Sequence, residues 1–197
     1  MLYNQRMDHL PAENDADFMG RSPRIVVMGS TGSGKTTLAQ QISRTLDVPH
    51  VELDALHWEH DWIAAPTDVF RRRVFEALEG DIWVADGNYT AVRDLVWPRA
   101  TALVWLNYPL RVLMWQLLSR TLRRTLRKEE LWNGNRERFF LQFFSRESLF
   151  LWLFRSYWRR RRTYLIAFNE PEHSHLEIVI LRSTKETRAW LSKIGVA

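Results

Sequence analysis

Five short apolar runs predict the strands of this protein. They lie at residues 24–28, 51–53, 82–85, 102–106 and 177–181. Runs that are apolar almost throughout are typical of strands buried on both faces of a parallel sheet. The second run is the weakest of the five because Glu52 interrupts it.

Between these runs, apolar residues recur every three or four positions, as they do along an amphipathic helix. This spacing predicts helices at residues 35–46, 67–78, 110–126, 139–168 and 184–194, with a break at 132–135. Gly80 suits a helix end, and Pro109 suits a first helical turn. Strands that alternate with helices predict an α/β fold in which a doubly wound, parallel, five-stranded sheet is covered on both faces.

The length of 197 residues and the hydrophobic content of 46% fit one domain with a small lid. Residues 1–21 are polar and without a sustained period, so we expect a flexible N-terminal extension before a domain at 22–197. No segment resembles a signal peptide or an uninterrupted membrane span, so we expect a cytoplasmic protein. The absence of cysteine excludes disulfides, a thiolate nucleophile and cysteine-bound metal.

The positive charge of the chain is concentrated in one region. The formal net charge is +5, but residues 111–162 hold 14 Lys and Arg against 4 Asp and Glu. A basic region of this kind suits a polyphosphate or a nucleic acid.

The segment GSTGSGKT at residues 29–36 predicts a phosphate-binding loop, because it follows a strand and precedes a helix. Its glycines let backbone N–H groups turn toward phosphate oxygens, the lysine reaches the terminal phosphates, and the threonine hydroxyl ligates Mg²⁺. A glycine-rich turn with a surface lysine is the less favoured interpretation. The predicted ATP-binding residues are Gly29, Ser30, Thr31, Gly32, Ser33, Gly34, Lys35, Thr36 and Thr37, with Lys35 also catalytic.

Two aspartates follow predicted strands, so we expect them at the same sheet edge as the loop. Asp86 is predicted to hold Mg²⁺ together with Thr36, although an Asp-Gly turn is the alternative. Asp54, at the end of the second strand, is predicted to orient or deprotonate an acceptor hydroxyl, although an aspartate there also caps helices. His57 and His60 lack an apparent third metal ligand, which favours a structural or substrate-lining role.

Arginines on the predicted helix at 110–126 are spaced to share one face. Arg120 and Arg124 are predicted catalytic residues that clamp the transferring phosphoryl group, with Arg120 also contacting ATP. A solvated basic face is the alternative, because Leu113, Leu117 and Leu118 are expected to supply the core side of this helix. Aromatic residues at helical intervals, including Phe140, Phe144 and Phe154, favour a buried helix face over stacking on nucleic-acid bases.

Four segments together resemble the bacterial adenylate-kinase-like P-loop proteins of the DNA topology modulation type. They are the loop at 29–36, LDALHW at 53–58, WVADGNY at 83–89 and ELWNGNRE at 130–137. The resemblance implies a fold of the nucleotide and shikimate kinase type, an acceptor-binding insertion at about 55–80 and an arginine-rich lid at about 115–165. Pro-Arg does not follow Asp86-Gly87, which makes AMP a doubtful acceptor, and Glu52 replaces the first Asp of the Asp-x-Asp of shikimate-type kinases.

These residues favour an ATP- and Mg²⁺-dependent kinase that moves the γ-phosphoryl group of ATP to a small acceptor, such as a nucleotide, a nucleoside or a metabolite hydroxyl. The first alternative is a nucleotide-dependent regulatory protein that binds nucleic acid, and the second is a nucleotide-gated interaction protein without turnover. Production of ADP that depends on an acceptor separates the kinase from both.

Overall fold

The structure, a computed structural model, describes residues 22–127 and 149–195, and the side chains of 22–123 and 153–195. The predicted extension at 1–21 and the central part of the predicted lid lie outside the described residues. Among the residues that are described, no helix combines the length and the apolar character that a membrane crossing requires.

The five predicted strands form one sheet in which every neighbouring pair is parallel. The strand order is β2-β3-β1-β4-β5. The strands are β1 (Arg24–Gly29), β2 (His50–Glu52), β3 (Trp83–Asp86), β4 (Ala102–Leu106) and β5 (Glu177–Leu181). Because the strands are parallel, their carboxyl ends meet at one edge, as the apolar runs predicted.

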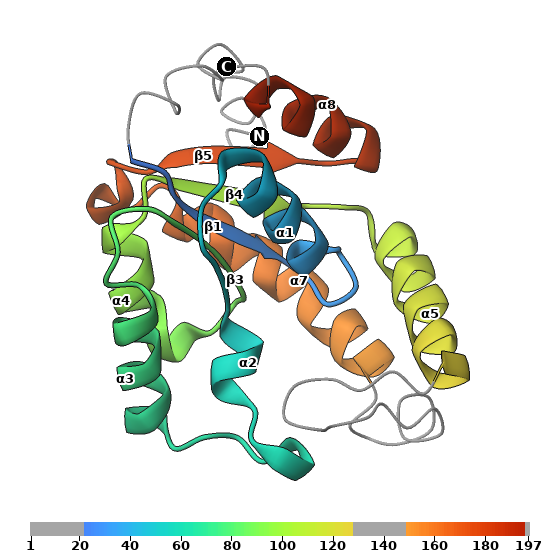
Figure 1. The fold of residues 1–197 in the computed structure, drawn as a ribbon. Helices are drawn as coiled ribbons and strands as arrows, with labels where there is room; N and C mark the ends of the chain where they lie inside the picture. Colours follow the sequence, from blue (N-terminus) through green and yellow to red (C-terminus); the bar gives the residue numbers. More distant parts are fainter. Residues whose placement is uncertain (1–21, 128–148, 196–197) are drawn as a thin grey trace.

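Helices cover both faces of this sheet, which confirms the doubly wound arrangement (Figure 1). On one face, α1 and α8 lie side by side, and α3, α4 and part of α7 cover the other. The larger helices are α1 (Lys35–Leu46), α3 (Thr67–Ala77), α5 (Leu110–Arg127), α7 (Leu149–Ala167) and α8 (Thr184–Ile194).

Alternate residues of β1 face two separate cores. Ile25 and Val27 pack into a cluster with α1, α5 and α8, whereas Val26 and Met28 pack into a cluster with α3 and the segment before β4. All four of these side chains are at most 2% exposed. The central strand is therefore held from both sides, which fixes the loop that follows it.

Short helices that the periodicity did not predict connect the main elements, because three to five residues are too few to show a helical period. They are α2 (Leu53–His57), α4 (Arg93–Val96) and the 3-10 helices η2 (His60–Trp62), η3 (Thr90–Val92), η4 (Trp97–Arg99) and η6 (Pro171–His173).

The structure corrects three predictions from the sequence. The second strand ends at Glu52, so Asp54 lies in the first turn of α2 and not at the strand end. On α5, Leu113 and Leu117 are buried as expected, but Leu118 is exposed. On α7, Phe154 is exposed because Leu153 and Tyr157, which come before and after it, face the core.

Candidate active site

The loop between β1 and α1 is shaped by glycines with positive φ. Gly34 has φ 89° and immediately precedes α1, whose first turn receives no side-chain cap. Gly32 has φ 77°, and a Cβ atom there would lie 3.0 Å from the Cβ of Leu117 on α5. The uncapped N–H groups at the start of α1 form an anion-binding feature, and the close packing on α5 holds the loop in place.

Lys35 is the first residue of α1 and is half-buried. Burial lowers the pKa of its ammonium from the ordinary value, Asp54 and Asp86 raise it, and Arg120 and Arg160 lower it further. The charges of two carboxylates and two guanidinium groups therefore act on Lys35. Its Nζ lies 3.4 Å from the carbonyl oxygen of Ser30, within the loop itself.

Asp86 at the end of β3 is 2% exposed and is held from two sides. Its Oδ2 accepts a hydrogen bond of 2.7 Å from the Thr36 hydroxyl, and its Oδ1 lies 2.8 Å from Nε2 of His50 on β2. The register pairs Val27 of β1 with Asp86, which brings the carboxylate next to the start of the loop. A threonine hydroxyl and a carboxylate are oxygen ligands of the kind that Mg²⁺ prefers.

Asn88 ties the turn after β3 to the beginning of the loop. Its Oδ1 accepts a hydrogen bond of 3.2 Å from the backbone N–H of Gly29, and its Nδ2 donates to the carbonyl oxygen of Gly29. Both polar atoms of one side-chain amide thus bind one residue of the loop. The turn after β3 and the loop after β1 are thereby held in a fixed relationship.

Asp54 on α2 receives a hydrogen bond of 2.5 Å at Oδ1 from the hydroxyl of Tyr89. Burial raises the pKa of the Tyr89 phenol strongly, and the charge of Asp54 raises it further. The phenol therefore stays protonated and remains a hydrogen-bond donor to the carboxylate. The ring of Tyr89 also packs on His57 and Phe70.

Arg120 lies three residues beyond Leu117, the α5 residue that packs on Gly32. Because α5 packs on the loop through Leu117, the Arg120 guanidinium is close enough for its charge to lower the pKa of Lys35. Arg124 is the next arginine along the predicted face, but its side chain lies outside the described residues. Its predicted role stays a prediction.

The two histidines of the insertion have different surroundings. His57 packs against the rings of Trp58, Phe70 and Tyr89, and burial lowers its pKa while Asp54 raises it. His60 is exposed and pairs with the neighbouring Asp61. His57 therefore has the packing of a structural or substrate-lining residue.

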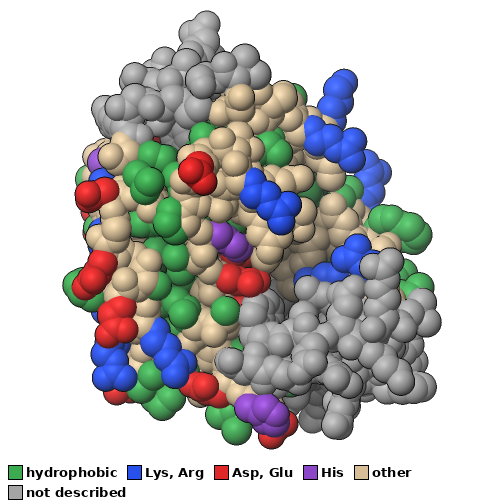
Figure 2. Space-filling view, viewed as in Figure 1, with side chains coloured by type: hydrophobic (Ala, Val, Ile, Leu, Met, Phe, Trp, Pro, Cys, Tyr) green, Lys and Arg blue, Asp and Glu red, His purple; other side chains and the backbone are tan. Residues whose placement is uncertain are grey.

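The structure places Thr36 against Asp86, and the charges of Asp54, Asp86 and Arg120 act on Lys35. The catalytic and metal-binding roles of these residues stay predictions. In the middle of the face shown in Figure 2, basic, acidic and histidine side chains lie close together beside a recess in the surface. His50 and Arg160 join this group without having been predicted. Asn88 and Tyr89 entered the sequence analysis only as part of a resembling segment, so their contacts were not foreseen.

The residues of the site fit a triphosphate and Mg²⁺. The positive-φ glycines and the uncapped first turn of α1 suit phosphate oxygens, and the paired oxygens of Thr36 and Asp86 suit a metal ion. Residues 29–34 and Lys35 would hold the phosphates, and Thr36 with Asp86 would hold the metal ion.

The fold and the loop define a P-loop α/β protein. A protein family described as PduV-EutP, ethanolamine utilisation - propanediol utilisation, matches residues 22–86, which is about a third of the chain.

Two solved structures resemble this chain over most of its length. A gluconokinase from Sinorhizobium meliloti 1021 is 20% identical, with 88% of this chain and 94% of that chain covered and a TM-score of 0.48. A shikimate kinase from Bacteroides thetaiotaomicron is 17% identical, with 87% and 95% covered and a TM-score of 0.49. At these identities and scores, the similarity assigns no substrate or activity to the chain.

Proposed function

We propose that this protein is a kinase that transfers the γ-phosphoryl group of Mg-ATP to a hydroxyl of a small acceptor. The observation that carries the proposal is the hydrogen bond of 2.7 Å between Thr36, directly after the loop lysine, and the buried Asp86. It supports the proposal because a hydroxyl oxygen and a carboxylate oxygen, side by side next to the loop, are suitable ligands for a metal ion. Asp54 adds a second carboxylate near Lys35.

Each group at the site has a separate role in this proposal. Lys35 and the uncapped N–H groups of α1 bind the phosphates, and Arg120 neutralises charge that develops as the phosphoryl group moves. Thr36 and Asp86 bind the metal ion, and His50 holds the Asp86 carboxylate in position. When bound, Mg²⁺ would neutralise part of the negative charge on the phosphates.

In this proposal, the Asp54 carboxylate contacts the hydroxyl of the acceptor. The acceptor oxygen forms a bond to the γ-phosphorus, the bond from that phosphorus to the β–γ bridging oxygen breaks, and ADP leaves with that oxygen. The proton of the acceptor hydroxyl passes to the Asp54 carboxylate, which Tyr89 holds in place.

The decisive experiment is incubation of the protein with Mg-ATP and a panel of nucleosides, nucleoside monophosphates and small metabolite alcohols. The proposal expects ADP to appear only with certain acceptors, together with a phosphorylated product. Lys35→Ala should nearly abolish this turnover, and Asp54→Asn should lower it far more than it weakens ATP binding. Lys35→Ala turnover equal to that of the wild type is incompatible with the mechanism.

A second candidate function is nucleotide-dependent binding of nucleic acid. The observation that favours it is the composition of α5 and α7, which contain five arginines each and no acidic residue. The resemblance to proteins of the DNA topology modulation type points in the same direction, and we place the chain with that type as part of this proposal. ATP hydrolysis that responds to DNA but to no small acceptor would favour this second function.

A further inference from the structure

Two glutamates and a buried histidine, Glu170, Glu172 and His173, meet in the connection between α7 and β5. One carboxylate or imidazole atom from each of these residues lies within 4.8 Å of the others. The connection contains η6 and ends at Glu177, the first residue of the parallel strand β5. The three residues therefore lie toward the amino edge of the sheet, whereas the phosphate-binding loop lies at the carboxyl edge (Figure 1). They form a cluster that is separate from the candidate active site.

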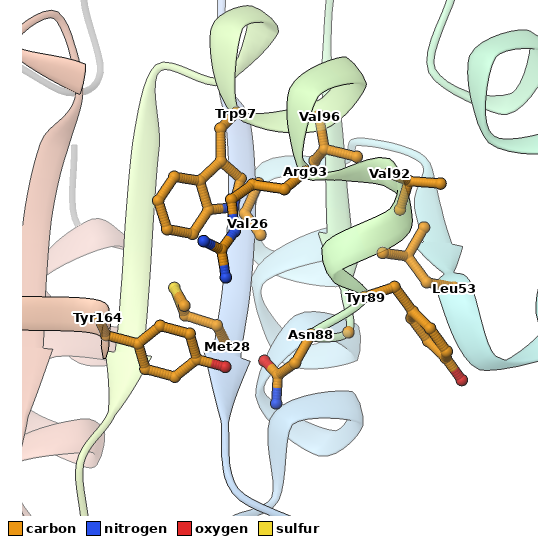
Figure 3. Close-up of a pocket in the computed structure, with 11 residues that line it drawn as sticks. Val26, Met28, Leu53, Asn88, Tyr89, Val92, Arg93, Val96, Trp97 and Tyr164 are labelled. Carbon is orange, nitrogen blue, oxygen red and sulfur yellow. The ribbon is translucent and has the colours of Figure 1, made fainter. Parts of the chain in front are cut away.

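His173 is held in one orientation inside the protein. It is 7% exposed, and its Nδ1 lies 2.8 Å from the carbonyl oxygen of Ala167 at the end of α7. Its ring packs edge to face on the ring of Trp97, with 4.9 Å between the centroids. Trp97 is in turn covered by Arg93, whose guanidinium carbon lies 4.7 Å from the centroid of the Trp97 ring (Figure 3). The imidazole is therefore packed in place before any ligand binds.

The second ring nitrogen of His173 faces a carboxylate. A carbonyl oxygen can only accept a hydrogen bond, so Nδ1 carries the proton that is donated to Ala167, and Nε2 of the neutral ring is an acceptor. Among the described residues, no group donates a hydrogen bond to Nε2, and Oε1 of Glu172 lies 3.6 Å from it. A buried acceptor that faces another acceptor requires a cation between them.

The separation of 3.6 Å between Nε2 and Oε1 of Glu172 fits a metal ion better than a shared proton. Nitrogen and oxygen atoms that share a proton lie about 2.7–3.2 Å apart. Two ligand atoms at about 2.0–2.2 Å from a tetrahedral Zn²⁺ ion lie about 3.4 Å apart. Histidines that bind metals usually donate their other ring N–H to a carboxylate or a backbone carbonyl, as His173 does to Ala167.

The two carboxylates have no basic side chain to offset their charges. Among the side chains that the structure describes, no lysine or arginine forms an ion pair with Glu170 or Glu172. Carboxylates this close to each other repel, and a divalent cation would remove the repulsion. Their side chains are 46% and 74% exposed, so an ion from solvent can reach both of them.

We propose that Glu170, Glu172 and His173 bind a divalent transition-metal ion such as Zn²⁺, with water completing its coordination. One imidazole and two carboxylates are ligands that suit such an ion, whereas Mg²⁺ prefers oxygen ligands alone. The ion would fix the end of α7 to the segment that carries Trp97, and so would stabilise the fold. The proposal does not depend on the proposed kinase function.

The test uses the full, untagged chain after treatment with a chelator. Zn²⁺ is titrated by calorimetry in an excess of Mg²⁺, which fills any site made of oxygen ligands alone. We expect one Zn²⁺ per chain, and a dissociation constant at least about tenfold higher in Glu170→Gln and in Glu172→Gln. Zn²⁺ should also raise the Tm of the wild type more than that of either variant. Both variants change exposed side chains and keep their size, so they should fold.

The matched control is His60→Gln. His60 is also a histidine beside a carboxylate, with Nδ1 3.0 Å from Oδ2 of Asp61, but within the described part of the chain no third ligand accompanies this exposed pair. His60→Gln should bind Zn²⁺ as the wild type does. His173→Gln should lose binding, and if this buried change prevents folding, the two glutamate variants decide the question.

The inference is wrong if Zn²⁺ does not bind the wild type, because a proton on Nε2 would then be the cation that faces Glu172. It is also wrong if Glu170→Gln and Glu172→Gln bind Zn²⁺ as tightly as the wild type, or if His60→Gln abolishes binding. The measurement needs no turnover, so failure of the kinase proposal and failure of this one are distinguishable.

Discussion

The hydroxyl of Tyr89 donates a hydrogen bond of 2.5 Å to Oδ1 of Asp54, and so joins the turn after β3 to the helix after β2. Tyr89→Phe removes this bond but keeps the ring that packs on His57 and Phe70. We expect acceptor-dependent kcat to fall about tenfold, because a hydrogen bond to a charged group contributes about 1.5–3 kcal/mol. The dissociation constant of ATP should not change.

Tyr108→Phe is the control for this prediction. It also removes a buried tyrosine hydroxyl, but that hydroxyl bonds Thr187 on α8. Its kcat should match that of the wild type. An equal loss of rate in both variants would mean that the effect comes from stability and not from the position of Asp54.

Asn88→Ala should weaken ATP binding by up to about thirtyfold, because it removes two hydrogen bonds that fix Gly29 at the start of the loop, each contributing about 1 kcal/mol. Calorimetric titration with Mg-ATP measures the change. Asn169→Ala, which also removes a bond from a side-chain amide to a backbone carbonyl, lies in the exposed turn after α7 and should leave ATP affinity unchanged. Equal affinity in the wild type and Asn88→Ala would contradict a role for this contact.

The reactivity of Lys35 should depend on pH in a way that reflects its burial. Burial lowers the pKa of its ammonium below the ordinary 10.5, so the neutral, reactive amine appears at lower pH than in a free lysine. At pH values between the lowered pKa and 10.5, Lys35 binds more protons in the unfolded chain than in the folded protein. The free energy of unfolding therefore increases as the pH rises through this window.

Acylation of the protein over a pH series, analysed by peptide mass spectrometry, measures this property. The labelling midpoint of Lys35 should lie below that of N-acetyl-lysine amide, and Mg-ATP should protect the residue. A midpoint at or above that of the reference compound would show that the carboxylates Asp54 and Asp86 outweigh burial.

Gly87→Ala should destabilise the fold. Gly87 has φ 147°, and a Cβ atom there would lie 2.8 Å from the Cβ of Leu53. We expect a loss of about 1–3 kcal/mol in the free energy of unfolding, measured in urea. Gly80→Ala is the matched control, because the nearest atom to its added Cβ is 3.7 Å away, and its stability should change little. Equal stabilities of the two variants would contradict the close approach.

The elements that could be predicted from the sequence are those with a strong local signal. The strands β1 and β4 are apolar runs, and α1 and α5 repeat their apolar residues over three turns or more. Short elements carry no such period. Asp54 was therefore placed at a strand end, whereas it lies in the five-residue helix α2.

The contacts of the site depend on which segments meet in space, and one sequence does not specify that. Arg160 stands within four consecutive arginines, so spacing alone cannot show which of them faces inward. Only the packing of α7 places Arg160 and Tyr164 on the inner side and leaves Arg159 and Arg162 exposed. His50 belongs to no recognisable sequence motif. Its contact with Asp86 arises because β2 pairs with β3 in the sheet.

The role of Arg120 separates the kinase from the nucleic-acid alternative. If its guanidinium clamps a transferring phosphoryl group, Arg120→Lys should lower kcat by at least about tenfold, or roughly 1.4 kcal/mol, because lysine keeps the charge but loses the planar fork. Arg111→Lys, at the exposed beginning of the same helix, should leave the rate unchanged. If Arg120 instead belongs to a diffuse nucleic-acid surface, lysine should substitute well, and binding should fall steeply with salt. Wild-type turnover in Arg120→Lys, together with salt-sensitive DNA binding that is lost in Arg120→Ala, would overturn the clamp and favour the alternative.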